Sequence, residues 1–121
     1  MTTLTDEARR KIREIHPALV ATASTSGRPH VSAKGCLRVL DDDHVAFADV
    51  ASPRTLTNIK ENPQVAIMFL DVVTRRGCCL WGQAEVITSG ELFESMAKEL
   101  AERNMKVNHV VKVAVEDIET F

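Results

Sequence analysis

The stretch that decides the fold is Ala51-Ser52-Pro53-Arg54-Thr55-Leu56-Thr57-Asn58, which joins an expected strand at Val45–Ala48 to a short helix. Ser52 is a typical N-cap residue, and Pro53 suits the first helical position because its fixed φ is preorganised for a helix. The first-turn N–H groups carry a partial positive charge, and the next two residues add a guanidinium group and a hydroxyl. This pattern predicts an anion site. An ordinary capped helix with a solvated Arg54 is the alternative that these residues alone leave open.

Length and charge limit the class of protein. A chain of 121 residues has room for a single domain, spanning 1–121, with one hydrophobic core. The formal net charge of −2 comes from interspersed acids and bases, which does not favour binding to nucleic acid or to an acidic membrane surface. The apolar run Val65–Leu70 is too short to cross a bilayer, and the N-terminus has no apolar signal segment. These features predict a cytoplasmic protein.

The cysteines and histidines do not have the spacing of a metal site. The chain has three cysteines without a Cys-x-x-Cys pair, and neighbouring Cys78 and Cys79 would point to opposite faces of a strand. The four histidines are scattered along the chain. We therefore expect reduced, structural thiols and no bound metal.

Three helices are expected, at about 6–16, at 53–61, and from the residue after Thr88 to about 104. Thr5 is positioned to cap the first helix, and Pro17 ends it. Thr88 and Glu91 have the spacing of a capping box at the start of the third helix. The apolar stripe of that helix is expected to be buried core, and it consists of Leu92, Phe93, Met96, Leu100 and Ala101.

Six strands are expected around these helices. An antiparallel hairpin combines a strand at 18–24 with a long second arm at 30–40, and further strands follow at 45–48, 64–70, 78–87 and 109–115. Gly82 inside one strand suggests a bulge or a close backbone approach. Because three helices are too few to alternate with these strands, the pattern favours a largely antiparallel barrel over a doubly wound α/β sheet.

Six segments, in this order along the chain, resemble the pyridoxamine 5′-phosphate oxidase-like FMN-binding split barrels. They are Gly27–Ser32, Leu37–Leu40, Val45–Asp49, Ser52–Thr55, Asn58–Ala66 and Trp81–Glu85. The match covers roughly residues 18–87 and is closer to the small stand-alone FMN-binding proteins than to the oxidase itself. The resemblance implies a mainly β fold, a six-stranded antiparallel split β-barrel with flanking helices. It also implies a homodimer with one FMN in each of two clefts at the subunit interface.

Carried over residue by residue, the resemblance places the FMN phosphate against Arg38, Arg54 and Thr55, with Ser52 and Asn58 nearby. This placement agrees with the anion site that the start of the second helix predicts independently.

The resemblance also implies a place for the isoalloxazine ring, along one strand and against the end of another. The residues concerned are Val31, Ser32, Ala33 and Lys34, followed by Ala48 and Asp49. In this placement Lys34 would stabilise negative charge near N1 and O2 of the reduced flavin. A solvent-facing lysine is the alternative.

The chain departs from the oxidase in two respects. Ala33 stands where the oxidase has an arginine, and Gly77 stands where it has a glutamine, so two polar flavin contacts are absent. The chain also ends at Phe121, shortly after the last expected strand, where the oxidase continues into a segment that holds pyridoxine phosphate. We therefore do not expect oxidation of vitamin B6 phosphates.

The leading interpretation is an FMN-dependent oxidoreductase or electron-transfer protein that takes electrons from a small-molecule or protein donor. The sequence identifies no catalytic acid or base. A non-redox binding or sensor protein for FMN, haem or the deazaflavin F420 is the alternative, and a homodimer that has lost its ligand is the third interpretation. An absorption spectrum of the purified protein separates these possibilities.

Overall fold

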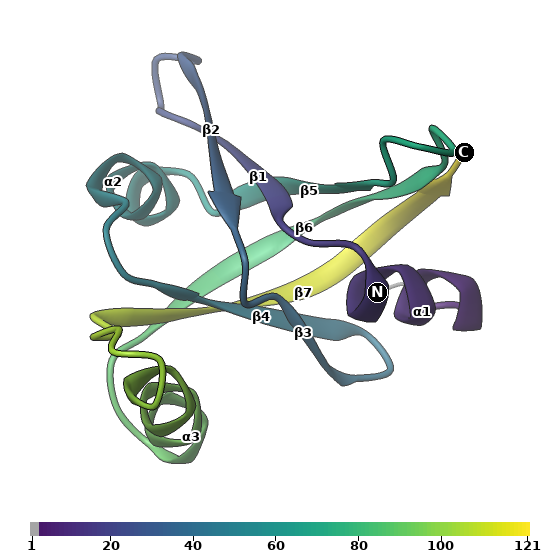
Figure 1. The fold of residues 1–121 in the computed structure, drawn as a ribbon. Coiled ribbons are helices and arrows are strands. Elements are labelled where there is room, and N and C mark those ends of the chain that lie inside the picture. Colours follow the sequence, from purple (N-terminus) through teal and green to yellow (C-terminus); the bar gives the residue numbers. More distant parts are fainter. Residues whose placement is uncertain (1–2) are drawn as a thin grey trace.

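A computed structural model describes residues 3–121, which form one curled antiparallel sheet with three helices packed around it (Figure 1). The elements, in chain order, are α1 (Asp6–Glu14), β1 (Ala18–Ala23), β2 (Pro29–Lys34), β3 (Arg38–Asp41), β4 (His44–Asp49), α2 (Pro53–Glu61), β5 (Gln64–Leu70), β6 (Gly77–Ile87), α3 (Glu91–Ala101) and β7 (His109–Thr120). The predicted fold class, a mainly β antiparallel barrel with flanking helices, is confirmed.

Within residues 3–121 the sheet has seven strands, one more than predicted, in the order β2-β1-β5-β6-β7-β4-β3. Every neighbouring pair in this order is antiparallel. The two edge strands, β2 and β3, are consecutive in the sequence. The chain therefore crosses from one edge of the sheet to the other between them, and this crossing is the split in the barrel.

The predicted single arm at 30–40 is wrong, because β2 ends at Lys34 and β3 begins at Arg38. Leu37 is buried in the barrel core. The Cys36 sulfur lies 3.2 Å from the N–H nitrogen and 3.4 Å from the carbonyl oxygen of Ala48 in β4. These contacts draw the linker at 35–37 away from β1 and towards β4. Side-chain alternation predicts a strand, but it does not say which strand is its partner.

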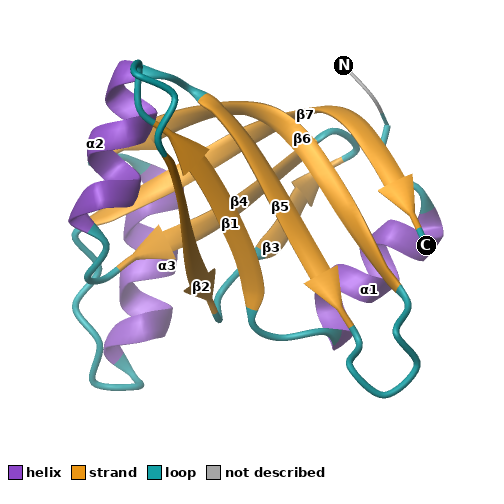
Figure 2. Ribbon diagram, turned by 90° about the horizontal axis from the view of Figure 1, so that it is seen from above, coloured by secondary structure: helices purple, strands orange, loops and turns teal. Residues whose placement is uncertain are grey.

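The barrel interior contains the inward-facing side chains of the strands, and α1 packs on it with Ala8 and Ile12, next to Leu4 from the segment before the helix. In this core the largest fully buried strand residues are Val20, Val45, Phe47, Ile67, Phe69, Leu80, Val111 and Val113. The predicted Thr5 cap is confirmed, since its Oγ1 accepts a hydrogen bond from the Ala8 N–H at 3.1 Å. Figure 2 shows α1 at the end of the barrel away from α2 and α3.

α3 packs outside the barrel, where Met96 and Leu100 lie against β4 and β7 in a second apolar cluster. The capping box predicted for Thr88 and Glu91 is wrong. Gly90 precedes the helix with a φ of +99°, a left-handed conformation that favours glycine, and Glu91 is the first helical residue. The helix ends at Ala101, which is exposed, so Ala101 does not belong to the buried stripe.

The predicted irregularity at Gly82 is confirmed. The pairing register between β6 and β7 shifts between Trp81 and Gly82. A Cβ atom at Gly82 would lie 2.2 Å from the carbonyl oxygen of Ala114, so the two backbones approach too closely for any other residue. In residues 3–121 no helix is long and apolar enough to span a membrane.

Candidate functional site

α2 begins at Pro53 as predicted, but the Ser52 side chain does not cap it. Ser52 is at the N-cap position and its carbonyl accepts the first helical hydrogen bond from Leu56 at 3.3 Å. Its Oγ, however, accepts a hydrogen bond from Lys34 Nζ and makes no cap bond to α2. Because no N-cap side chain occupies the first turn, its N–H groups remain available for an anion.

A cavity of about 300 Å³ lies between the start of α2 and the β1–β2 turn, and we name it the α2 cavity. Arg54 and Asn58 of α2 line it, together with Arg28 and His30 from the turn and β2. The Arg54 side chain is exposed and has no hydrogen-bond or ion-pair partner in residues 3–121. The cavity therefore combines a free guanidinium group with an uncapped helix start.

Sequence reasoning missed Arg28 and His30 as possible ligands of an anion. Arg28 lies in a Gly-Arg-Pro turn, which indicates a hairpin, and His30 follows this turn. Only the packing of the β1–β2 turn against α2 places them in the same cavity as Arg54.

Two side-chain hydrogen bonds hold α2 against the hairpin. Ser32 Oγ and Thr55 Oγ1 are 3.0 Å apart, and Asn58 Nδ2 donates to Thr22 Oγ1 at 3.0 Å. Thr55 is completely buried. The structure thus brings Ser32, Thr55 and Asn58 together, but Thr55 contributes to the orientation of α2 and does not present an open hydroxyl.

A second cavity, of about 320 Å³, contains several of the residues predicted to line the flavin ring, and we name it the ring cavity. Of the predicted ring residues, Ala33, Lys34 and Ala48 line it, whereas Ser32 and Asp49 do not. Ser52, which the resemblance places near the phosphate, also lines this cavity. Val31 lies outside it, with 59% of its surface exposed on the outer face of β2.

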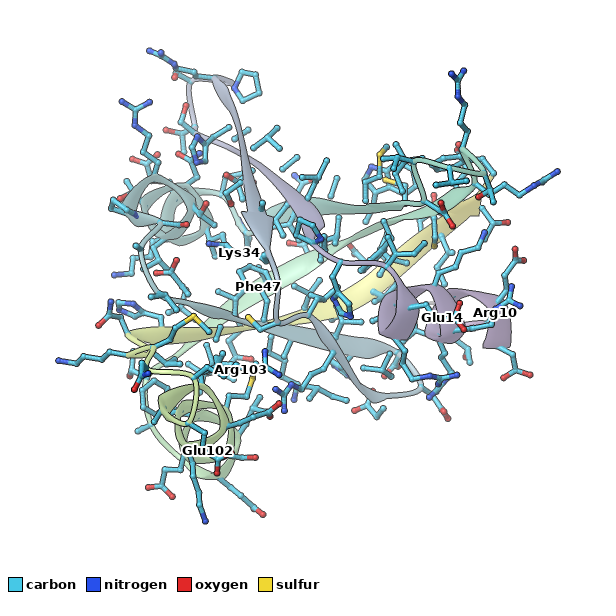
Figure 3. The ribbon with its side chains drawn as sticks, viewed as in Figure 1. Arg10, Glu14, Lys34, Phe47, Glu102 and Arg103 are labelled. Atoms are coloured by element: carbon cyan, nitrogen blue, oxygen red, sulfur yellow. The ribbon has the colours of Figure 1, made fainter. Side chains whose placement is uncertain are left out.

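Lys34 does not face solvent, so that alternative is wrong. Its side chain is 6% exposed, and its Nζ lies 3.3 Å from Oδ1 of Asp49, which is 3% exposed. The ammonium group also lies 5.9 Å from the centroid of the Phe47 ring, and Figure 3 shows the two side chains next to each other. Since a buried charge is tolerated only when it is paired, Lys34 supplies a fixed positive charge at the wall of the ring cavity.

His109 is a polar neighbour of this ion pair that sequence reasoning did not identify. It is the register partner of Asp49 across β4 and β7, and its Nδ1 lies 4.0 Å from Asp49 Oδ2. Nδ1 is buried and has no hydrogen-bond partner in the described part of the chain. No sequence signal indicates this neighbour, because the pairing of β4 with β7 joins residues 60 positions apart.

Arg38 lies away from α2. One of its terminal nitrogens is 2.6 Å from a carboxylate oxygen of Glu99, and Arg38 lines a third cavity of about 760 Å³. Within one protomer the structure does not bring Arg38 to Arg54 and Thr55. Its role at a flavin phosphate therefore remains a prediction from the resemblance.

Asp41, Asp43 and His44 form a small polar cluster in the β3–β4 turn. His44 Nδ1 lies 2.8 Å from a carboxylate oxygen of each aspartate. Hydrogen bonds, above all from the Asp43 N–H and then from His44, lower the pKa of Asp41 to about 2. The carboxylates are already engaged within the turn, and we assign no metal to them.

The three cysteines are free, as expected. Burial raises the pKa of the Cys78 thiol to about 11 and also raises the pKa of Cys79. At neutral pH both thiols are therefore protonated and poorly nucleophilic.

Gly77, where the oxidase has a glutamine, has no space for a side chain in this backbone. A Cβ atom there would lie 2.1 Å from the carbonyl oxygen of Phe69 and 2.9 Å from the Phe121 ring. A polar flavin contact from this position is thus excluded by packing as well as by sequence.

The open antiparallel barrel and its crossing between β2 and β3 define a split β-barrel protein. The profile of the pyridoxamine 5′-phosphate oxidase family matches residues 4–121. The chain therefore belongs to the pyridoxamine 5′-phosphate oxidase family.

Solved structures show the same architecture. HupZ from Group A Streptococcus is 28% identical, with a TM-score of 0.89 over 97% of this chain and 93% of that chain. A candidate pyridoxamine 5′-phosphate oxidase from Lactobacillus delbrueckii is 25% identical, with a TM-score of 0.82 over 98% and 95%. An FMN-binding protein from Syntrophomonas wolfei is 18% identical, with a TM-score of 0.88 over 97% and 85%, and this likeness concerns the fold alone.

More distant relatives of the fold have different names. An F420 reductase is 17% identical, with a TM-score of 0.73 over 95% of this chain and 98% of that chain. The haem storage protein HutZ from Vibrio cholerae is 22% identical, with a TM-score of 0.68 over 100% of this chain and 94% of that chain. An uncharacterized protein of Methanocaldococcus jannaschii is 46% identical over 50 residues, 40% of this chain and 34% of that protein. The match thus spans about a third of the length of this curated relative.

Proposed function

We propose that the protein is a homodimeric flavoprotein that binds FMN and serves as an oxidoreductase or electron carrier. The observation that carries the proposal is the path of residues 51–54. Ala51 and Ser52 line the ring cavity, and Pro53 and Arg54 line the α2 cavity. A single chain segment therefore joins an apolar-walled space to an anion-binding helix start, which suits a molecule with a planar ring at one end and a phosphate at the other.

In this proposal the α2 cavity holds the phosphate. Arg54 would donate charge-assisted hydrogen bonds to it, and the uncapped first-turn N–H groups of α2 would donate further hydrogen bonds. Arg28 and His30 line the same cavity from the β1–β2 turn and β2. The buried bonds of Thr55 and Asn58 keep α2 in the orientation that presents Arg54. Because Arg54 has no protein partner within residues 3–121, no ion pair has to break when phosphate binds.

In the ring cavity, Lys34 holds positive charge where a reduced ring carries negative charge, and Asp49 holds Lys34 in place. Bound FMN would supply the transfer of hydride or electrons. The backbone of Ala33, Lys34 and Ala48 would orient the ring edge.

The outer face of β2, β1, β5 and β6 supports the homodimer. Directly paired residues of antiparallel strands share a face, which places Val31, Ala21, Ala66 and Trp81 in one row across the four strands. Leu19, Ala33 and Met68 lie in the adjacent row. Leu19, Val31 and Trp81 are 40%, 59% and 38% exposed, so this sheet face is apolar and uncovered in one protomer.

Ala33 belongs both to this apolar face and to the lining of the ring cavity. A second subunit packed on the face would therefore border the proposed ring site. This relation suits a cofactor at a subunit interface. We also propose, as the sequence suggests, that the protein is cytoplasmic and that a small molecule or a protein supplies its electrons.

The test is the absorption spectrum of the purified protein, before and after addition of FMN, followed by anaerobic addition of NADH, NADPH or dithionite. We expect one FMN per subunit and a flavin that a donor bleaches. A haem spectrum, a deazaflavin spectrum, or an FMN that no donor reduces would instead identify a protein of the non-redox binding class or one with another cofactor.

A further inference from the structure

The imidazole of His109 has a buried nitrogen for which the protein supplies no partner. Its Nδ1 makes no hydrogen bond to any group of residues 3–121. The side chain nevertheless reaches the surface, since 28% of it is exposed, so the imidazole can exchange a proton with solvent. Buried polar atoms in proteins are usually hydrogen-bonded, and an unpaired one therefore needs a physical reason.

Backbone contacts hold His109 beside Asp49. The two residues are register partners in β7 and β4. Asn108 donates its N–H to the carbonyl of Asp49 at 3.0 Å and its Nδ2 to the carbonyl of Val50 at 2.8 Å, which fixes the start of β7 against the end of β4. The 4.0 Å between His109 Nδ1 and Asp49 Oδ2 is too long for a hydrogen bond. It is short enough for strong attraction once the imidazole is charged.

Asp49 is the carboxylate that His109 faces, and its other oxygen, Oδ1, lies 3.3 Å from Nζ of Lys34 in β2. The side chains of α3 and β6 that pack on this end of β7 are apolar, and they are Met96, Leu100 and Ile87. The nearest charged residues on either side of His109 in the sequence are cations, Lys106 and Lys112, and the ring cavity lining adds Arg103. A proton on His109 is therefore balanced by the carboxylate that also balances Lys34.

The protonation of His109 changes the charge at the wall of the ring cavity. With a neutral imidazole, the charges of Lys34 and Asp49 cancel. With a protonated imidazole, two cations share one carboxylate, and the three side chains together carry a net positive charge. Histidine is the side chain that gains or loses its proton near neutral pH. Because Lys34 lines the ring cavity, the added charge acts on whatever the cavity holds.

We propose that His109 is a positioning residue of the ring cavity, and that its imidazole takes up a proton when negative charge develops there. Reduction of bound FMN with two electrons from the donor and one proton leaves a negative charge on the ring. His109 then takes a second proton from solvent, and its Nδ1–H donates to Asp49 Oδ2, which frees part of the Lys34 charge for the ring. The sharing of Asp49 follows from the geometry, whereas the coupling to a reduced ring rests on the proposed flavin function.

The first experiment tests the sharing of Asp49 in protein without a ligand. Lys34→Met removes one of the two partners of Asp49, and urea unfolding at pH 8 and pH 5.5 measures the resulting shift in midpoint. The shift should be about half as large at pH 5.5, because a protonated imidazole replaces part of the lost ion pair. Protonation of Asp49 itself would also reduce the shift, but it would do so equally in a His109→Gln background. That background should therefore lose most of the difference between the two pH values.

His44→Gln is the matched control. It removes an imidazole at the other end of β4, where His44 lies beside Asp41, and it should leave the pH dependence of the Lys34→Met shift unchanged. Lys34→Gln takes the place of Lys34→Met if the methionine variant does not fold at pH 8. The same pH dependence with and without His109 would overturn the proposal.

The second experiment measures the coupling to the ring. Potentiometric titration of FMN-loaded protein with dithionite, between pH 5.5 and pH 8, gives the number of protons taken up with each pair of electrons. The wild type should take up about one proton more than His109→Gln, because the imidazole balances the charge of the reduced ring. At pH 6 it should also bind reduced FMN about tenfold more tightly than the variant does. The spectrum of the reduced flavin shows whether the additional proton lies on the ring instead.

These outcomes separate the inference from the proposed function. Equal proton uptake by the wild type and His109→Gln, with flavin bound, would remove the coupling of His109 to the ring. A protein that takes up no flavin would contradict the proposed function and the coupling with it. The unfolding measurements then decide by themselves whether His109 shares Asp49 with Lys34.

Discussion

The ammonium group of Lys34 and the carboxylate of Asp49 are 3.3 Å apart and almost completely buried, and they join two strands that are not neighbours in the sheet. Lys34 ends edge strand β2, whereas Asp49 ends β4, next to the opposite edge. This ion pair therefore bridges the split of the barrel. It also explains how a charged side chain remains stable at the wall of the ring cavity, since its partner is equally buried.

Replacing Lys34 by methionine should lower the free energy of unfolding by about 3–5 kcal/mol, because it leaves the buried Asp49 carboxylate without its partner. Urea unfolding followed by circular dichroism measures the change. The double variant Lys34→Met with Asp49→Leu should recover most of the loss, since it removes both charges. A single variant as stable as the wild type would show that the pair contributes nothing.

Arg54→Ala should weaken FMN binding about tenfold to a hundredfold while riboflavin affinity changes little, because a charge-assisted bond to phosphate is worth roughly 1.5–3 kcal/mol. Fluorescence quenching titrations of both flavins give the comparison. Arg76→Ala, at an exposed arginine of the β5–β6 loop, is the control and should change neither affinity. Equal losses for the two flavins would remove Arg54 from the phosphate site.

Val31→Asp should convert the proposed dimer into monomers, since it places a charge on the apolar face of β2, β1, β5 and β6, at its most exposed apolar residue among Leu19, Val31 and Trp81. Light scattering coupled to size-exclusion chromatography reports the mass. Val72→Asp is the matched control, because Val72 is 78% exposed in the β5–β6 loop, outside the rows of that face. If wild-type protein is monomeric with FMN bound, the interface proposal is wrong.

Cys78 should resist iodoacetamide at pH 8 in the folded protein and react readily in urea. Burial raises its pKa from the ordinary 9.0 to about 11, so the folded state favours the neutral thiol. This contribution to stability is complete below about pH 9 and is lost as the pH rises towards 11. The urea midpoint of the wild type should therefore fall more steeply above pH 9 than that of Cys78→Ala. Parallel curves would contradict the raised pKa.

FMN-loaded protein should produce little or no pyridoxal phosphate from pyridoxine 5′-phosphate under air. Ala33 offers no polar group where the oxidase has one, and Gly77 has no room for a side chain, so two ring contacts are missing. Loss of orientation at the reacting centre can reduce a rate by several powers of ten. Chromatography of the reaction mixture measures the pyridoxal phosphate formed. Robust formation would show that the protein is a pyridoxine 5′-phosphate oxidase, contrary to this prediction.

Local signals predicted the elements that depend on neighbouring residues. The bounds of α2 follow from Pro53 at its start and Asn62-Pro63 after its end, and the apolar run 64–70 is β5 as expected. The start of α3 was less predictable, because Gly90 with a positive φ replaced the expected capping box. Which N-cap forms depends on the path by which the chain leaves β6 at Ile87.

Part of the candidate site was accessible from the sequence and part was not. The anion site at the start of α2 was predicted from Ser52, Pro53 and Arg54, although the serine hydroxyl bonds to Lys34 and leaves the helix uncapped. The contributions of Arg28 and His109 could not be predicted, because the segment Gly27–Ser32 does not show that Arg28 faces α2, and His109 lies in no motif. They reach the site only through the contact of a turn with α2 and the pairing of β7 with β4.

By itself the sequence determined the strand-rich fold class, the helix at 53–61 and the bulge at Gly82, since these arise from side-chain periodicity, proline geometry and steric limits within a few residues. Only the tertiary structure decided that the chain breaks after Lys34 and that β2 and β3 become opposite edges of the sheet. Because of this break, Lys34 forms an ion pair with Asp49, and Arg38 forms an ion pair with Glu99. Strand partners are chosen by contacts between residues far apart in the sequence, and no local pattern records them.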